Sequence, residues 1–95
     1  MPGFNIKVYR NGDESFEGKR FLVNGRMRNL DQLMEQVTRG IKASFGAVRS
    51  IRTPTRGTRI QSLSGLQPDG EYVATGAQMF RRLNYKKIQV PKAVH

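Results

Sequence analysis

The sequence predicts a small α+β domain in which a mixed sheet of four to five strands packs on one main helix. Three observations lead to this prediction. The chain has 95 residues, a length that suits one domain. Short segments that alternate between apolar and polar residues lie on both sides of a single segment with helical periodicity. Turn-forming residues, Asn-Gly pairs among them, separate these segments.

The first two predicted strands form a hairpin. Residues 4–8 alternate between apolar and polar side chains, which is typical of a half-buried strand. Asn11-Gly12 follows and predicts a tight type I′ turn, because both central residues of that turn need a positive φ. The partner strand is predicted over residues 15–23, with a bulge at Gly18.

One segment after the hairpin has the spacing of a helix with a single apolar face. Its apolar positions recur at i, i+3, i+4 and i+7 from Leu30 to Ile41. Asn29 is the predicted N-cap, and Gln32 completes a pair that resembles a capping box. Arg39 lies in the last turn, where a cation suits the helix dipole.

Shorter elements are predicted after the helix. A strand around Ile51 ends at Pro54, which cannot donate to a strand ladder. Residues 59–61 and 72–75 predict two more strands, the second of them central in the sheet. Residues 63–66 predict a helical turn docked on the core. A hairpin, one helix and then further strands is the element order of a ubiquitin-like β-grasp fold.

The domain is predicted to cover residues 4–85, the last of which, 80–85, form an extended segment that packs back on the core. Residues 86–95 are predicted as a basic C-terminal tail or linker. The first three residues lead at once into the first strand, so we expect no signal peptide.

The charge of the chain points to a partner of opposite sign. Lys and Arg number 17 against 7 Asp and Glu, a formal net charge of +10. Most of the cations fall in three acid-free windows, residues 19–28, 39–59 and 81–92. This excess favours a polyanion such as nucleic acid, an acidic protein or an anionic membrane, although a solvated basic surface needs no partner. The absence of cysteine favours a reducing, intracellular setting.

No catalytic, cofactor-binding or metal-binding constellation is found in the sequence. The only histidine is His95, so no serine has the usual general base within the domain. Asp69 and Glu71 flank a turn glycine and fit solvated turn residues better than an acid–base pair. The sequence therefore predicts a binding module that is not an enzyme and needs no cofactor.

The aromatic residues argue against nucleic acid as the partner. Single-strand binders stack bases on exposed aromatic side chains. Here five aromatics have core-like positions: Phe4, Phe16, Phe45, Tyr72 and Phe80. Tyr9 and Phe21 are not assigned to the core, because they fall on the faces of their strands opposite to the core-facing residues. We expect neither nucleic acid nor a membrane to be the partner, and an acidic protein remains.

Seven motifs follow one another at fitting spacings: KVYRNGD at 7–13, FEG at 16–18, RNLDQLM at 28–34, VTR at 37–39, GAVRSI at 46–51, LQPDGEYV at 66–73 and FRRLNY at 80–85. Together they resemble the doublecortin domain over nearly the whole chain. The resemblance implies a ubiquitin-like fold, in agreement with the element order. It also implies binding to microtubules, often through two tandem domains, at the groove where tubulin subunits meet.

The resemblance implies that four residues occupy basic positions of that family: Arg28, Arg39, Arg81 and Arg82. Charge clustering adds seven candidate microtubule- or partner-binding residues: Lys19, Arg20, Arg49, Arg56, Arg59, Lys86 and Lys87. We expect these eleven residues to dock on acidic tubulin and the module to help stabilise microtubules.

Two departures from the family pattern favour an alternative. Arg52 stands where the family usually has an aromatic residue, and residues 53–60 form a longer turn that resembles doublecortin-domain proteins associated with cilia. A protein-interaction scaffold domain in intracellular signalling or cilia, with weak or no microtubule binding, is the second hypothesis. We expect a monomer from a longer tandem protein, located in the cytoplasm on the cytoskeleton, the ciliary axoneme included.

Overall fold

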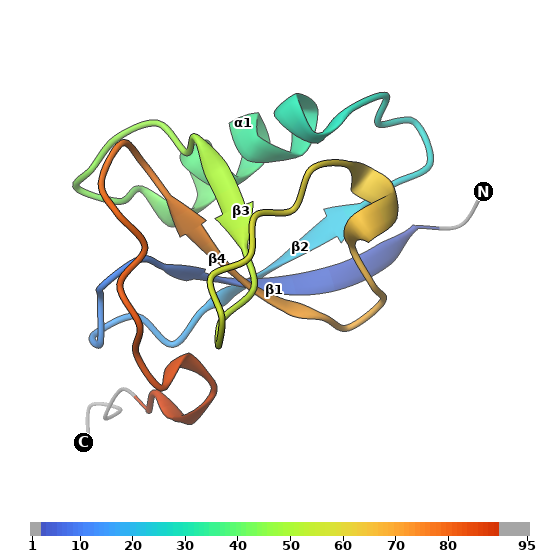
Figure 1. The fold of residues 1–95 in the computed structure, drawn as a ribbon. Coiled ribbons are helices and arrows are strands. Elements are labelled where there is room, and N and C mark those ends of the chain that lie inside the picture. The colour runs from blue at the N-terminus through green and yellow to red at the C-terminus, as the bar shows by residue number, and fades with distance from the viewer. Residues whose placement is uncertain (1–2, 90–95) are drawn as a thin grey trace, which may run out of the picture.

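Four strands form one mixed sheet in the order β2-β1-β4-β3 (Figure 1). They are β1 (Phe4–Arg10), β2 (Lys19–Val23), β3 (Ser50–Arg52) and β4 (Glu71–Thr75). In this computed structural model, which describes residues 3–89, β1 pairs antiparallel with β2 and parallel with β4. β3 pairs antiparallel with β4. The predicted α+β, ubiquitin-like fold with one main helix is confirmed. Of the central strands, β4 is buried at four of its five residues, and β1 at Ile6, Val8 and Tyr9.

The helix α1 (Leu30–Ile41) begins and ends where its capping residues place it. The Asn29 side chain accepts a hydrogen bond from the Gln32 N–H at 3.1 Å, and the Gln32 side chain accepts one from the Arg28 N–H at 2.6 Å. At the other end Lys42 has a left-handed φ of 47°. Because Lys42 leaves the helical conformation, the helix stops there.

Two hydrophobic clusters lie on opposite faces of the sheet. Ile6 and Val8 of β1 point toward α1 and join the main core. Tyr9 points the other way and packs with Val73 and Tyr85 in a second cluster. Alternate positions of a strand face opposite sides, so β1 serves both clusters. Tyr9 and Phe21 are therefore buried. Four aromatics predicted for the core are only partly buried: Phe4, Phe16 and Phe45 pack against the main core, and Phe80 packs against the second cluster.

The connection between β1 and β2 is not the predicted tight turn. Gly12 has a φ of 75°, but Asn11 keeps a negative φ, and β2 begins at Lys19. Gly18 precedes the strand, so the predicted bulge inside it is wrong. The physical reason is tertiary: the Asn11 side chain is buried and bonded to the distant segment around Arg81. Residues 11–18 consequently form a loop.

The segment between β3 and β4 also differs in part from the prediction. Residues 59–61 do not form a strand, because only Arg59 makes a bridge, to Arg52. The helical turn expected there is a short 3-10 helix, η1 (Leu63–Gly65). The strand around Ile51 is present, and the central position of β4 is confirmed.

The C-terminal segment crosses the face of the sheet away from α1. Phe80, Leu83 and Ile88 pack against the second cluster. A 3-10 helix, η2 (Tyr85–Lys87), spans the boundary that the sequence places after residue 85. The remainder of the predicted tail, residues 90–95, lies outside the described residues.

Candidate binding surface

All of the predicted site residues are exposed. They are Arg28, Arg39, Arg81, Arg82, Lys19, Arg20, Arg49, Arg56, Arg59, Lys86 and Lys87. Within residues 3–89 the one ion pair joins Arg10 and Asp13 at 3.2 Å. The exposed cations of that part of the chain thus have no carboxylate partner inside the molecule, and their charge is directed to solvent.

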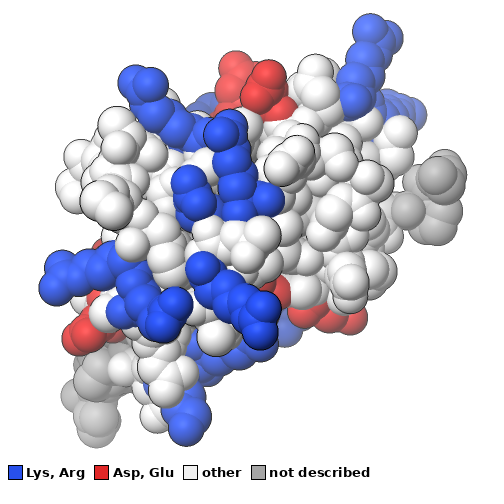
Figure 2. Space-filling model, in the orientation of Figure 1, with Lys and Arg blue, Asp and Glu red and all other residues white. Residues whose placement is uncertain are grey.

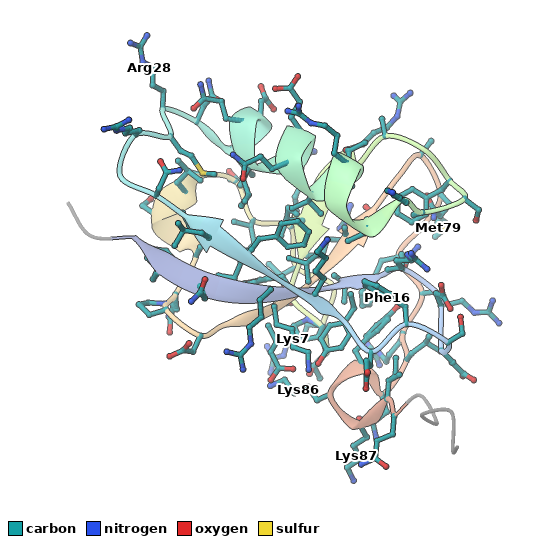
Figure 3. The ribbon with its side chains drawn as sticks, turned by 180° about the vertical axis from the view of Figure 1, so that it is seen from behind. Lys7, Phe16, Arg28, Met79, Lys86 and Lys87 are labelled. Atoms are coloured by element: carbon teal, nitrogen blue, oxygen red, sulfur yellow. The ribbon has the colours of Figure 1, made fainter. Side chains whose placement is uncertain are left out.

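The structure does not bring these residues into one patch. Figure 3 shows Arg28 at one end of the molecule and Lys86 and Lys87 at the opposite end. Figure 2 shows Lys and Arg side chains gathered on the face that carries β3 and its neighbouring segments, with Asp and Glu mostly toward the margins. The basic residues therefore divide among several surfaces.

One of these basic areas joins the second and third acid-free windows. A Cβ placed on Gly57 would lie 2.4 Å from the Phe80 ring, so the loop after β3 packs directly against the segment that carries Arg81. We define the β3 surface by the four exposed arginines of these two segments: Arg56, Arg59, Arg81 and Arg82. Residues far apart in the sequence form it, which charge clustering along the chain could not reveal.

Arg52 holds the loop that carries part of this surface, through hydrogen bonds of its side chain. Its guanidinium donates hydrogen bonds to the Gly57 carbonyl at 2.9 Å and to the Ser50 hydroxyl at 3.3 Å. The loop also closes on itself, because the main-chain N–H of Thr53 donates to the carbonyl of Thr58 at 2.9 Å. Arg52 is half-buried and holds the longer turn that presents Arg56. The departure from the family's usual aromatic residue therefore has a structural use.

Asn11 and Tyr85 fix the main chain on both sides of Arg81. The Asn11 side chain donates to the Met79 carbonyl at 2.8 Å and accepts from the Arg81 N–H at 2.7 Å. The Tyr85 hydroxyl donates to the Arg81 carbonyl at 2.5 Å and accepts from the Gly12 N–H at 3.0 Å. Burial raises the pKa of Tyr85, so the hydroxyl stays protonated and keeps donating. Arg81 and Arg82 are thus presented by a fixed backbone.

These supporting residues were missed by sequence reasoning. Asn11-Gly12 was interpreted as a local turn, and Tyr85 as the end of a closing segment. Both lie in motifs that resemble the family, at 7–13 and 80–85. Their burial and their mutual contacts are visible only in the structure, so the motifs alone do not link them.

Arg10 is a cation that the fold itself uses. Its guanidinium donates to the Ile41 carbonyl, at 2.7 Å from Nε, and lies 4.1 Å from the centre of the Phe16 ring. Hydrogen bonds from Ser15, together with the Arg10 charge, lower the pKa of Asp13. Arg10 therefore caps the C-terminal end of α1 and is not available to a partner.

A second basic area lies on the face of the sheet away from α1, beside η2. Lys7 and Arg20 are cross-strand partners in β1 and β2, and with Lys86 they line a shallow depression of about 280 Å³. Asp69 and Glu71 line it as well, and the Tyr9 hydroxyl donates a hydrogen bond to Glu71. This area carries both signs of charge, unlike the β3 surface.

Two grooves run along α1. One of about 540 Å³ is lined by Asp31, Met34 and Arg59, and one of about 490 Å³ by Asp31, Met34 and Arg39. Each groove carries acidic and basic side chains. Residues 3–89 contain no cluster of three or more metal-binding side chains of the His, Cys, Asp and Glu type. In the same part of the chain, no helix combines the length and apolar character that spanning a membrane requires.

The fold and its surface define a ubiquitin-like α+β domain whose exposed cations, within residues 3–89, have no carboxylate partner inside the molecule. The profile of the doublecortin family matches residues 22–80. The chain belongs to the doublecortin family.

Relatives cover most of this chain but are themselves much longer. Mouse "Doublecortin domain-containing protein 2" is 42% identical over 85 residues, which are 88% of this chain and 18% of that protein. Human "Doublecortin domain-containing protein 2C" is 44% identical over 92 residues, 96% of this chain and 25% of that protein. Mouse "Serine/threonine-protein kinase DCLK2" is 33% identical over 85 residues, 11% of its length. The shared part is a small fraction of that kinase, so its activity is not carried to this chain.

Proposed function

We propose that this chain is a microtubule-binding module that docks its β3 surface on the acidic tubulin lattice. The observation that carries the proposal is the gathering of Lys and Arg side chains over β3 and the segments beside it (Figure 2). The arginines of the β3 surface are exposed and form no ion pair within residues 3–89. Membership of the doublecortin family supports tubulin as the acidic protein. In the full-length protein, residues 4–85 act as one domain of a longer chain, and residues 86–95 form a basic tail or linker.

Electrostatics supplies both the encounter and the specificity in this proposal. A basic surface accelerates association with an acidic lattice. Arginine pairs with carboxylates in a planar, bidentate geometry, which favours defined acceptor positions over diffuse attraction. Exposed ion pairs contribute only about 0.2–1 kcal/mol each, so several arginines must act together. The complex is expected to weaken as salt screens these pairs.

Co-sedimentation with taxol-stabilised microtubules at low and at high salt tests the proposal. We expect the domain to pellet at low salt and to be released as the ionic strength rises. If no domain pellets even at low salt, tubulin is not its partner.

A protein-interaction scaffold domain is the second candidate. The longer turn at 53–60, held by Arg52, favours it because this loop offers shape as well as charge. Such a domain would retain a specific partner at moderate salt, in signalling assemblies or in cilia. A pull-down from ciliated cells at that salt distinguishes the two functions, since recovery of tubulin alone counts against the scaffold.

Nucleic acid ranks below both candidates. All eight aromatic residues lie within residues 3–89, and each is at least partly buried. No aromatic side chain is therefore presented for base stacking. A gel-shift assay at physiological salt is expected to show no retardation. We propose a location on the cytoskeleton, in the cytoplasm or the ciliary axoneme, because the proposed partner is tubulin.

A further inference from the structure

β2 is the outer strand of the sheet, and its outer edge is unpaired in the described part of the chain. Among residues 3–89, no main-chain hydrogen bond joins residues 19–23 to any segment other than β1. The opposite edge differs, because the Ile60 N–H donates to the Ile51 carbonyl of β3 at 2.8 Å. An unpaired row of N–H and C=O groups is a template for a further strand.

The register identifies which main-chain groups face outward. The Lys7 N–H donates to the carbonyl of Gly70, just before β4, at 2.9 Å, and the Asn11 N–H donates to the carbonyl of Ala74 in β4 at 3.0 Å. The main-chain N–H and C=O groups of odd-numbered β1 residues therefore point toward β4, and those of even-numbered residues point toward β2. Ile6 pairs with Phe21 in the antiparallel register, so the main chain of Phe21 points toward β1. The N–H and C=O groups of Arg20 and Leu22 consequently point away from the sheet.

The side chains of the same two residues are also accessible. Leu22 is 51% exposed, one of the two large hydrophobic side chains that stand out in this way. Arg20 is exposed beside its cross-strand partner Lys7 and the nearby Lys86. Asp69 and Glu71 line the same depression, and Glu71 accepts a hydrogen bond from the Tyr9 hydroxyl. In Figure 3, β2 lies in front of β1, with α1 above it and η2 below it. The edge thus presents hydrogen-bonding groups, an apolar side chain and cations together.

The charge on this edge selects the kind of strand that can be added. Lys19 and Arg20 are the type of residue that keeps edge strands from pairing with copies of themselves. Two copies of this chain, each with a formal charge of +10, would also repel each other. An acidic strand would instead be attracted.

We propose that the β2 edge binds an extended acidic segment of a partner protein as a fifth strand. The main chain of that segment pairs with the outward groups of Arg20 and Leu22, as in other cases of strand addition. A carboxylate of the segment pairs with the Arg20 guanidinium, and an apolar side chain covers Leu22. This site is separate from the β3 surface and does not depend on the proposed function.

The probe for this site is a capped hexapeptide in which Glu and Val stand two positions apart with Thr between them, titrated into the isotope-labelled domain. Side chains two positions apart lie on the same face of a strand, so Glu and Val can contact Arg20 and Leu22 together. We expect amide chemical shifts to change most at Arg20 and Leu22 and hydrogen exchange at both to slow. A peptide of the same sequence, N-methylated at the residues whose N–H groups would face β2, is the matched control. It keeps the charge but loses the main-chain donors, so binding should weaken about tenfold or more. Equal binding of both peptides, or shifts centred on the β3 surface, would overturn the proposal.

Variants of Leu22 give an independent test. Leu22→Pro removes the outward N–H without removing a bond to β1, because proline is tolerated where its nitrogen faces solvent on an edge strand. We expect this variant to lose peptide binding and to pellet with microtubules as the unmodified domain does. Leu22→Ser covers the case in which the proline variant does not fold, with Met79→Ser as a control at the other exposed hydrophobic residue, which is 89% exposed. If Leu22→Ser and Met79→Ser weaken peptide binding equally, the β2 edge is not the site.

Discussion

At the scale of single residues, Asn11 shows how one side chain links the fold to its surface. It is 8% exposed, and its amide satisfies main-chain groups of Met79 and Arg81. The local sequence Asn-Gly predicts a hairpin turn, and local reasoning cannot detect a bond between residues 11 and 81. A buried side chain with tertiary partners therefore overrode a strong local preference.

Asn11→Ala should lower the free energy of unfolding by about 1–3 kcal/mol, because two main-chain groups lose their partner in a buried position. It should also weaken microtubule binding, since the backbone that carries Arg81 is released. Urea unfolding and co-sedimentation measure the two effects. Asn5→Ala is the matched control, because Asn5 lies on β1, the strand that leads to Asn11, and is exposed. Equal losses for the two variants would contradict the role given to Asn11.

Tyr9 and Tyr85 should make the stability sensitive to alkaline pH. Burial raises the pKa of both phenols above the ordinary value of 10.0, and the neighbouring Glu71 raises that of Tyr9 further. In the unfolded chain both ionise near pH 10, whereas in the folded state they remain protonated. Stability is therefore retained below that pH and lost as the pH rises above it.

Unfolding in urea at pH 7 to 11 measures this dependence. Tyr85→Phe should reduce the alkaline loss and also cost about 1–2 kcal/mol at neutral pH, because the Arg81 carbonyl and the Gly12 N–H lose their partner. An unchanged pH profile in this variant would show that Tyr85 does not contribute.

At the scale of elements, periodicity and capping residues predict those helices and strands whose formation depends on local interactions. The helix from Leu30 to Ile41 and the central strand β4 follow directly from these patterns. The loop after β3 could not be predicted, because its shape depends on Arg52 and on contact with Phe80. The same holds for the β3 surface, whose cations come from separate windows of the sequence and meet only in the folded chain.

A comparison of Gly57, in the loop after β3, with Gly46, which precedes β3, distinguishes the cost of backbone strain from the cost of lost packing. Both have positive φ, 72° and 84°, but a Cβ at Gly57 would lie 2.4 Å from Phe80, whereas one at Gly46 would meet nothing within 4 Å. Gly46→Ala should cost about 1–2 kcal/mol from conformation alone. Gly57→Ala should cost more and should shift the Phe80 resonances. Thermal unfolding and NMR spectra check this, and equal costs would argue against the contact.

At the scale of the whole molecule, the net charge of +10 is divided by the fold into separate uses. Arg10 and Arg52 are drawn inward to support α1 and the loop after β3. The cations of the β3 surface and those beside β2 are exposed, and we propose that the former bind an acidic partner and the latter an extended strand. Composition indicated a polyanionic partner from the beginning, but only the tertiary structure separates supporting cations from presented ones.

The most direct test compares two single charge reversals in a microtubule binding titration at low salt. Arg82 lies in the β3 surface, and Arg26 is an exposed arginine outside it. The substitutions Arg82→Glu and Arg26→Glu change the net charge by the same amount. We expect Arg82→Glu to weaken binding about tenfold, because one favourable pair becomes a repulsive one, and Arg26→Glu to have a small effect. Equal losses would show that net charge alone attracts the domain, and that the β3 surface is not where it binds.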